Sequence, residues 1–211
     1  MKTLLLSSLL LLAIAAQAHG RCRRNSDISS VLARAVRYHP AIKAAAIRYS
    51  VDPRLLWTIG YLETRFEPRC VSPKGARGMM QFIPATGRRY GLFTRRDLHD
   101  PIRSIDAAAR YVRDLNAMFG GKIDLVLAGY NAGEYAVINS RYKVPPYRET
   151  RRYVALGLSV FKRIADGDLF SLHLLPSVAA LKETSHSPHV ALRRPASFPR
   201  KQPARSIYFP L

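Results

Sequence analysis

Apolar residues recur at three- and four-residue steps through the middle of the chain, a spacing that predicts amphipathic α-helices. The clearest run extends from Pro53 to Phe66. Asp52 and Pro53 predict its start, because an aspartate can cap free backbone N–H groups and proline suits the first helical position. Pro68 predicts that the helix ends soon afterwards. The apolar face of this helix comprises Leu55, Leu56, Ile59, Leu62 and Phe66.

Weaker patterns of the same kind predict more helices along the chain. The alanine-rich segment from Ile28 to Tyr49 has helical character, with a break expected at Pro40. Ser104 is the expected cap of a helix that Gly120 and Gly121 would stop. No long alternating run predicts a major sheet, so the expected class is all-α. The other predicted helices are a short one around Met80 and the segments 123–133 and 147–165.

The long apolar helix carries a carboxylate beside its apolar face. Glu63 follows Ile59 by four residues and Leu56 by seven, so it lies on or next to that face. Partial burial and the negative end of the helix dipole both disfavour the charged form of such a carboxyl. A carboxyl held protonated near neutral pH can donate its proton to a leaving oxygen. The simpler alternative is a boundary residue whose side chain reaches water.

Four sequence blocks favour the catalytic interpretation of Glu63 over this simpler alternative. They are Glu63-Thr64-Arg65-Phe66, the segment from Ser72 to Thr86 (SPKGARGMMQFIPAT), Tyr130-Asn131-Ala132-Gly133, and the segment from Pro146 to Val154 (PYRETRRYV). In content and order they resemble the soluble lytic transglycosylase catalytic domain, part of the goose-type-lysozyme-like group. The resemblance covers about residues 38–167 and implies an all-α, lysozyme-like fold. Thr64 departs from the usual serine of this family, and Gly129 from the usual alanine.

The resemblance implies a role for each matching residue. Glu63 would be the single catalytic acid and base, and Tyr153 would place its hydroxyl near the Glu63 carboxyl. Each of the other matches has a structural alternative: Ser72 as a turn residue, Met80 as core filler, the tyrosines as packing residues and Asn131 as part of a helix cap. The implied substrate-binding residues are Ser72, Met80, Gln81, Tyr130, Asn131 and Tyr153.

The implied reaction uses one carboxylate where most glycosidases use two. Glu63 would protonate the oxygen between N-acetylmuramic acid and N-acetylglucosamine in peptidoglycan, and the muramyl 6-hydroxyl would then close a 1,6-anhydro ring. No metal or cofactor is expected. Asp97 and Asp100 stay open as a second carboxylate, whereas Glu67 is expected to point away. The alternatives are a goose-type lysozyme, in which water attacks, and a non-catalytic peptidoglycan-binding scaffold.

The N-terminus has the pattern of a secretory signal peptide. Lys2 precedes an apolar run, and Ala16-Gln17-Ala18 is a small-x-small cleavage site. Residues 1–18 are therefore expected to be removed, leaving an exported, periplasmic and envelope-associated protein without a stable membrane anchor; an uncleaved anchor is the alternative. Two cysteines pair readily in an oxidising compartment, which predicts a Cys22–Cys70 disulfide over two free thiols.

The chain is strongly basic, which bears on its expected partners. The chain carries a formal net charge of +20 and a sequence pI of about 10.7. Such a field favours anionic partners, of which the cell envelope and peptidoglycan rank above nucleic acid for an exported protein. Family habit also suggests an envelope-spanning secretion or conjugation complex as a partner. The expected regions are a basic arm (19–36), the catalytic domain (37–170) and a disordered, basic, proline-rich tail (171–211).

Overall fold

A computed structural model of the chain describes residues 27–165. This part is helical, and its only extended pairings are isolated bridges within residues 71–82. The all-α prediction is therefore confirmed. The predicted signal peptide, residues 19–26 of the basic arm, Cys22 and the tail lie outside the described residues. The helices are α2 (Ile28–Tyr49), α3 (Pro53–Thr64), α4 (Pro84–Arg89), α5 (Arg95–His99), α6 (Pro101–Phe119), α7 (Ile123–Ala132), α8 (Glu134–Asn139) and α9 (Arg148–Ala165).

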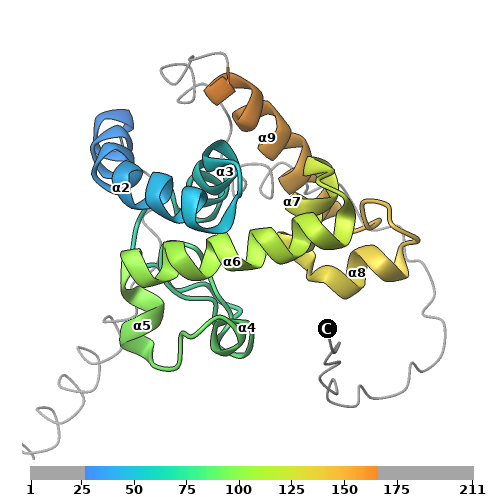
Figure 1. Ribbon diagram of the computed structural model, residues 1–211, viewed down its shortest axis with the longest axis horizontal. Helices are drawn as coiled ribbons and strands as arrows, with labels where there is room; N and C mark the ends of the chain where they lie inside the picture. The colour runs from blue at the N-terminus through green and yellow to red at the C-terminus, as the bar shows by residue number, and fades with distance from the viewer. Residues whose placement is uncertain (1–26, 166–211) are drawn as a thin grey trace, which may run out of the picture.

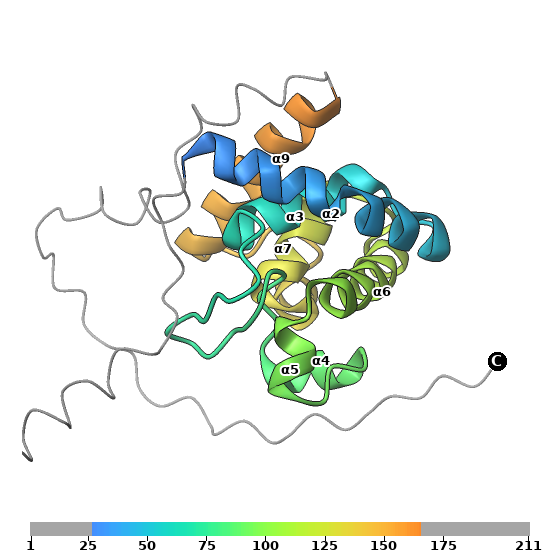
Figure 2. The same ribbon diagram turned by 90° about the vertical axis from the view of Figure 1, so that its left-hand side faces the viewer.

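The helices are arranged around α6, which runs across the centre of Figure 1. Helices α2 and α3 lie on one side of α6, and α4 and α5 lie on the other. Figure 2 shows the same separation from the side. Helix α9 packs against both α3 and α7. The acid-bearing helix α3 is thus held between α2, α6 and α9.

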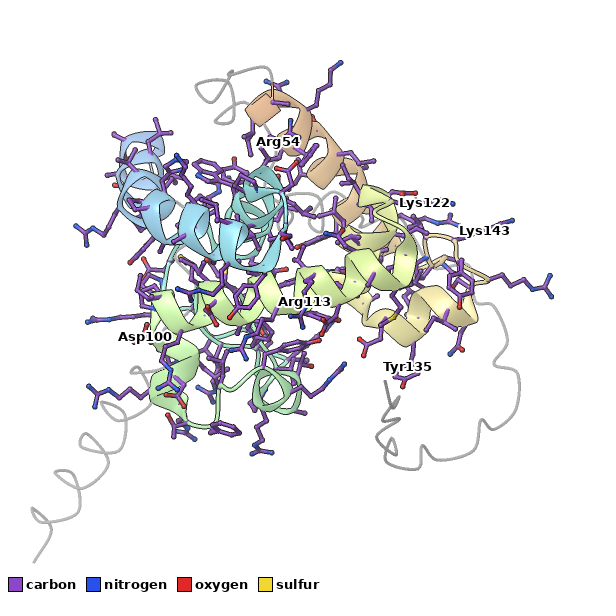
Figure 3. The ribbon with its side chains drawn as sticks, viewed as in Figure 1. Arg54, Asp100, Arg113, Lys122, Tyr135 and Lys143 are labelled. Atoms are coloured by element: carbon purple, nitrogen blue, oxygen red, sulfur yellow. The ribbon has the colours of Figure 1, made fainter. Side chains whose placement is uncertain are left out.

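Two aspartates set the starts of the helices that build the centre. Asp52 caps α3 by accepting a hydrogen bond from the N–H of Arg54, as predicted. Asp100 caps α6 in the same way, with proline at the next position. The prediction that Ser104 caps this helix was wrong: Ser104 is buried inside α6. Figure 3 shows Asp100 where α5 meets α6.

The predicted break at Pro40 is absent, because α2 continues through it to Tyr49. A proline inside a helix leaves the carbonyl four residues earlier without its N–H partner. That carbonyl belongs to Val36, whose side chain is exposed, as is that of Pro40. Water can therefore hydrate this face of the helix. On the other face, Ala35, Tyr38 and Ile42 are buried in the core, so the helix is packed on both sides of Pro40.

Several boundaries differ from the expected ones. Helix α3 ends at Thr64, since Arg65 and Phe66 both take left-handed backbone conformations. Met80 lies in turns, and the short helix of this region is α4, which Pro84 begins. The six-residue helix α8 was not predicted. Within residues 27–165, no helix has the length and apolar character needed to cross a bilayer.

Candidate active site

The Glu63 side chain contacts the hydroxyl of a tyrosine that lies 90 positions later in the chain. The Tyr153 hydroxyl on α9 donates a hydrogen bond to Oε1 of Glu63, with an oxygen–oxygen distance of 2.7 Å. Glu63 is half-buried, whereas Tyr153 is buried. Burial, followed by the nearby Glu63 charge, raises the pKa of Tyr153 well above its usual value. Tyr153 therefore stays protonated and remains a donor to Glu63 throughout the neutral range.

The four sequence blocks are linked in a closed circuit by four hydrogen bonds. Tyr153 joins the fourth block to Glu63 in the first. The remaining links run from the first block to the second, from the second to the third and from the third to the fourth. They are Thr64 Oγ1 to the Met79 carbonyl (2.8 Å), Tyr130 Oη to the Met80 carbonyl (2.9 Å), and Thr150 Oγ1 to Asn131 Oδ1 (2.9 Å).

Thr64 has a structural task that explains the hydroxyl at this position. Its buried Oγ1 donates to the Met79 carbonyl and accepts a hydrogen bond from the N–H of Glu67 at 3.1 Å. Either serine or threonine can make both bonds, so the departure from the family pattern preserves the link between α3 and the following loop.

We expect Thr64→Val to lower the free energy of unfolding by about 2 kcal/mol, because it leaves a buried carbonyl and an N–H group without their partner. Thr64→Ser is the control, since it keeps the hydroxyl and removes one methyl group, at a cost of about 1 kcal/mol or less. Urea unfolding of the two variants measures the difference. Equal losses would contradict the assigned role of the hydroxyl.

The candidate residues of the second block differ in what their side chains can offer a ligand. Gln81 is half-buried, and its amide nitrogen donates to the Gly78 carbonyl at 2.8 Å, which leaves the amide oxygen able to accept from a ligand. The Ser72 hydroxyl accepts from the N–H of Ala76 at 3.0 Å and so helps to close a tight loop. Met80 is fully buried, which favours the core-filling alternative for its side chain. Its carbonyl, however, anchors Tyr130.

Tyr130 is held by an aromatic cluster that the sequence analysis missed. Its ring lies 5.3 Å from that of Tyr111 and 6.2 Å from that of Phe82, measured between centroids. Burial, and then the Glu63 charge, raises the pKa of Tyr130 well above its usual value. Tyr111 faces the core from the apolar side of α6, so helical spacing alone could have identified it.

Glu134 supports the same cluster and was also missed. It is buried at the start of α8, where Arg89 approaches one carboxylate oxygen at 2.7 Å and the Tyr111 hydroxyl donates to the other at 3.0 Å. Burial alone would raise the pKa of Glu134, but the backbone and Arg89 hydrogen bonds outweigh it and lower the pKa. Glu134 is therefore a charged, paired carboxylate and no proton donor. Its position directly after Gly133 was the available sequence signal.

The other acids considered in the sequence have structural partners. Asp97 accepts from the N–H groups of Phe93 and Thr94 and pairs with Arg103. Asp100 caps α6. Glu67 accepts from the N–H of Arg69 at 3.3 Å.

Within residues 27–165, no cluster of three or more His, Cys, Asp and Glu side chains is placed to hold a metal ion. Cys70 is buried and is not a free thiol. The predicted pairing of Cys70 stays a prediction, because Cys22 lies outside the described residues.

The sequence is similar to those of lytic murein transglycosylases. Membrane-bound lytic murein transglycosylase D of Escherichia coli K12 is 29% identical over 167 residues, which cover 72% of this chain and 37% of that protein. Membrane-bound lytic murein transglycosylase F 1 of Alkalilimnicola ehrlichii is 38% identical over 103 residues, 46% of this chain and 20% of that protein. The chain thus spans well under half the length of these relatives.

The helices of this chain also match those of a solved structure. The crystal structure of the 70 kDa soluble lytic transglycosylase of Escherichia coli matches with a TM-score of 0.55 and 25% identity, covering 62% of this chain and 25% of that one. The fold is therefore lysozyme-like as well as all-α, as expected from the motifs. The family model of the transglycosylase SLT domain matches residues 40–149, just over half of the chain. The matched segment contains Glu63 and the first three blocks, and the chain belongs to the transglycosylase SLT domain family.

Proposed function

We propose that the chain is an exported lytic transglycosylase that cleaves the glycan strands of peptidoglycan without water. The observation that carries this proposal is the hydrogen-bonded circuit that joins the four blocks around Glu63. Its relatives are lytic murein transglycosylases by name. The other described acids named above serve caps, turns and ion pairs, which favours a reaction that needs one carboxylate.

The proposed reaction returns the proton to its donor. Glu63 gives its proton to the oxygen that links N-acetylmuramic acid to N-acetylglucosamine, and the bonding electrons leave with that oxygen. The substrate's N-acetyl group stabilises the positive charge that develops at the anomeric carbon. The ionised Glu63 then takes the proton of the muramyl 6-hydroxyl, whose oxygen bonds to that carbon. An internal nucleophile of this kind has a much higher effective concentration than a separate molecule.

Tyr153 has a defined task in this scheme. By donating to Oε1, its hydroxyl fixes the orientation of the carboxyl and stabilises the anion formed when Glu63 has lost its proton. The other carboxyl oxygen is then the one that carries the transferred proton. The high pKa of Tyr153 keeps this donor in place while the charge of Glu63 changes.

We expect Tyr153→Phe to lower kcat by about ten- to a hundredfold, since a hydrogen bond to a charged group contributes about 1.5–3 kcal/mol. Tyr147→Phe is the matched control, because it makes the same chemical change at an exposed tyrosine just before α9. Steady-state cleavage of soluble glycan strands measures both variants. A Tyr153→Phe variant as active as Tyr147→Phe would exclude this role for the hydroxyl.

Mass spectrometry of the muropeptides released by the purified chain tests the proposed function. A transglycosylase releases 1,6-anhydro ends, which are lighter by one water molecule than the reducing ends left by a goose-type lysozyme. Reducing ends would therefore overturn the proposal in favour of hydrolysis. Glycan binding without any product would favour a scaffold. Docking to a secretion or conjugation complex stays a prediction, because the arm and tail that would provide it lie largely outside the described residues.

A further inference from the structure

The chain turns sharply directly after the acid-bearing helix. Arg65 and Phe66 both have positive φ angles, of 53° and 63°. A residue other than glycine pays about 1–2 kcal/mol for this left-handed conformation. Two such residues in succession, beginning two positions after Glu63, persist only if their surroundings hold them there. The contacts that hold this turn therefore also hold the last turn of α3, which carries Glu63.

Part of the support comes from α3 and the following loop. The Phe66 ring is fully buried and meets the ring of Trp57 edge-on, with centroids 4.6 Å apart. Gly60 makes room for it, because a Cβ atom there would lie 2.8 Å from the Phe66 ring. Thr64 ties the start of the turn to the Met79 carbonyl. These contacts hold Phe66 and Thr64. They provide no hydrogen-bond donor for the carbonyl of Arg65.

Arg34 of α2 provides that remaining contact. Its Nε atom donates to the Arg65 carbonyl at 3.2 Å, across a helix pair that lies side by side in Figures 1 and 2. The guanidinium also brings positive charge to the carbonyl end of α3, where the helix dipole is negative. The Nη2 atom of the same side chain is buried without a hydrogen-bond partner. Burying this donor costs stability, which the other contacts of Arg34 have to offset.

We propose that Arg34 is a positioning residue for Glu63, acting through the carbonyl of Arg65. Arg34 lies before residue 40, where the match to the SLT family begins, so this support comes from outside the matched segment. The start of α2 is thereby coupled to the candidate catalytic carboxyl. This inference rests on the proposed function of Glu63.

The test compares Arg34→Leu and Arg34→Lys with Arg37→Leu in the full chain. Arg37 lies on the same helix, but its side chain is exposed. Misplacing a reacting group by about 1 Å can cost about a hundredfold in rate. We therefore expect Arg34→Leu to lower kcat on soluble glycan strands by about tenfold or more. KM should be nearly unchanged, because the proposed role concerns the placement of the reacting carboxyl and not substrate binding. Arg34→Lys keeps a charged donor and should recover most of the loss. Arg37→Leu should match the wild type.

A second measurement separates this inference from the proposed function. Hydrogen exchange of the backbone N–H groups of residues 65–67 should be faster in Arg34→Leu than in Arg37→Leu, whether or not the chain cleaves glycan. Equal exchange and equal kcat in these two variants would overturn the positioning role while leaving the proposed function intact. A loss of kcat that vanishes after correction for the folded fraction would also overturn it. A wild type that cleaves nothing would refute the proposed function instead.

Discussion

Replacing Glu63 by glutamine is expected to abolish glycan cleavage while the fold survives. Glutamine keeps the shape of the side chain and can still accept the hydrogen bond from Tyr153, but it has no proton to give and no negative charge with which to take one. A general acid or base contributes about 10²–10⁴-fold to a rate, and here one group would serve both steps. We therefore expect a loss of at least about a thousandfold, measured as the release of muropeptides.

Glu67→Gln is the matched control for this result. It makes the same chemical change four residues further on, where the carboxylate serves a turn by accepting the N–H of Arg69. It should retain nearly full activity. The circular dichroism and melting temperature of both variants should stay close to those of the wild type. A Glu63→Gln variant that still cleaves at a rate close to that of Glu67→Gln would refute the assignment of the catalytic acid.

Gly78→Ala is expected to cause the largest loss of stability among single substitutions in the motif blocks. Gly78 has a φ angle of +76°, and a Cβ atom there would lie 1.7 Å from the backbone carbonyl oxygen of Leu98 in α5. The obstacle is a backbone atom, so no change of rotamer can relieve it. We expect a cost of about 4 kcal/mol or more, the range reached when steric conflict and backbone strain combine. Urea unfolding measures this loss.

Gly75→Ala isolates the backbone strain from the steric conflict. Gly75 has a similar φ angle of +81°, but nothing lies within 4 Å of the position its Cβ would occupy. Alanine should therefore cost about 1–2 kcal/mol there. Activity should fall further in Gly78→Ala, because the Gly78 carbonyl also receives the Gln81 side chain. If the two variants were equally stable, close packing of this loop on α5 would be disproved.

Two errors of the sequence analysis have a common physical origin in tertiary packing. Pro40 was expected to break α2, yet its effect depends on whether the carbonyl four residues earlier faces water, which tertiary packing decides. Phe66 was placed inside α3 because its spacing is helical, whereas burial of its ring beside Trp57 holds it in a left-handed turn. Ser104 was preferred as a cap although Asp100 precedes a proline, as Asp52 does at the start of α3. That last error was avoidable from sequence.

What the sequence by itself determined was local. Capping chemistry set the start of α3, apolar spacing set the helical class, and the four blocks identified the family, because each depends on residues close together along the chain. Only the tertiary structure decided which side chains meet. Glu63 and Tyr153 are 90 positions apart, and Thr64 and Met79 are 15 apart. Their hydrogen bonds, like the contact of Arg34 with Arg65, form only when packing of apolar faces brings separate helices together.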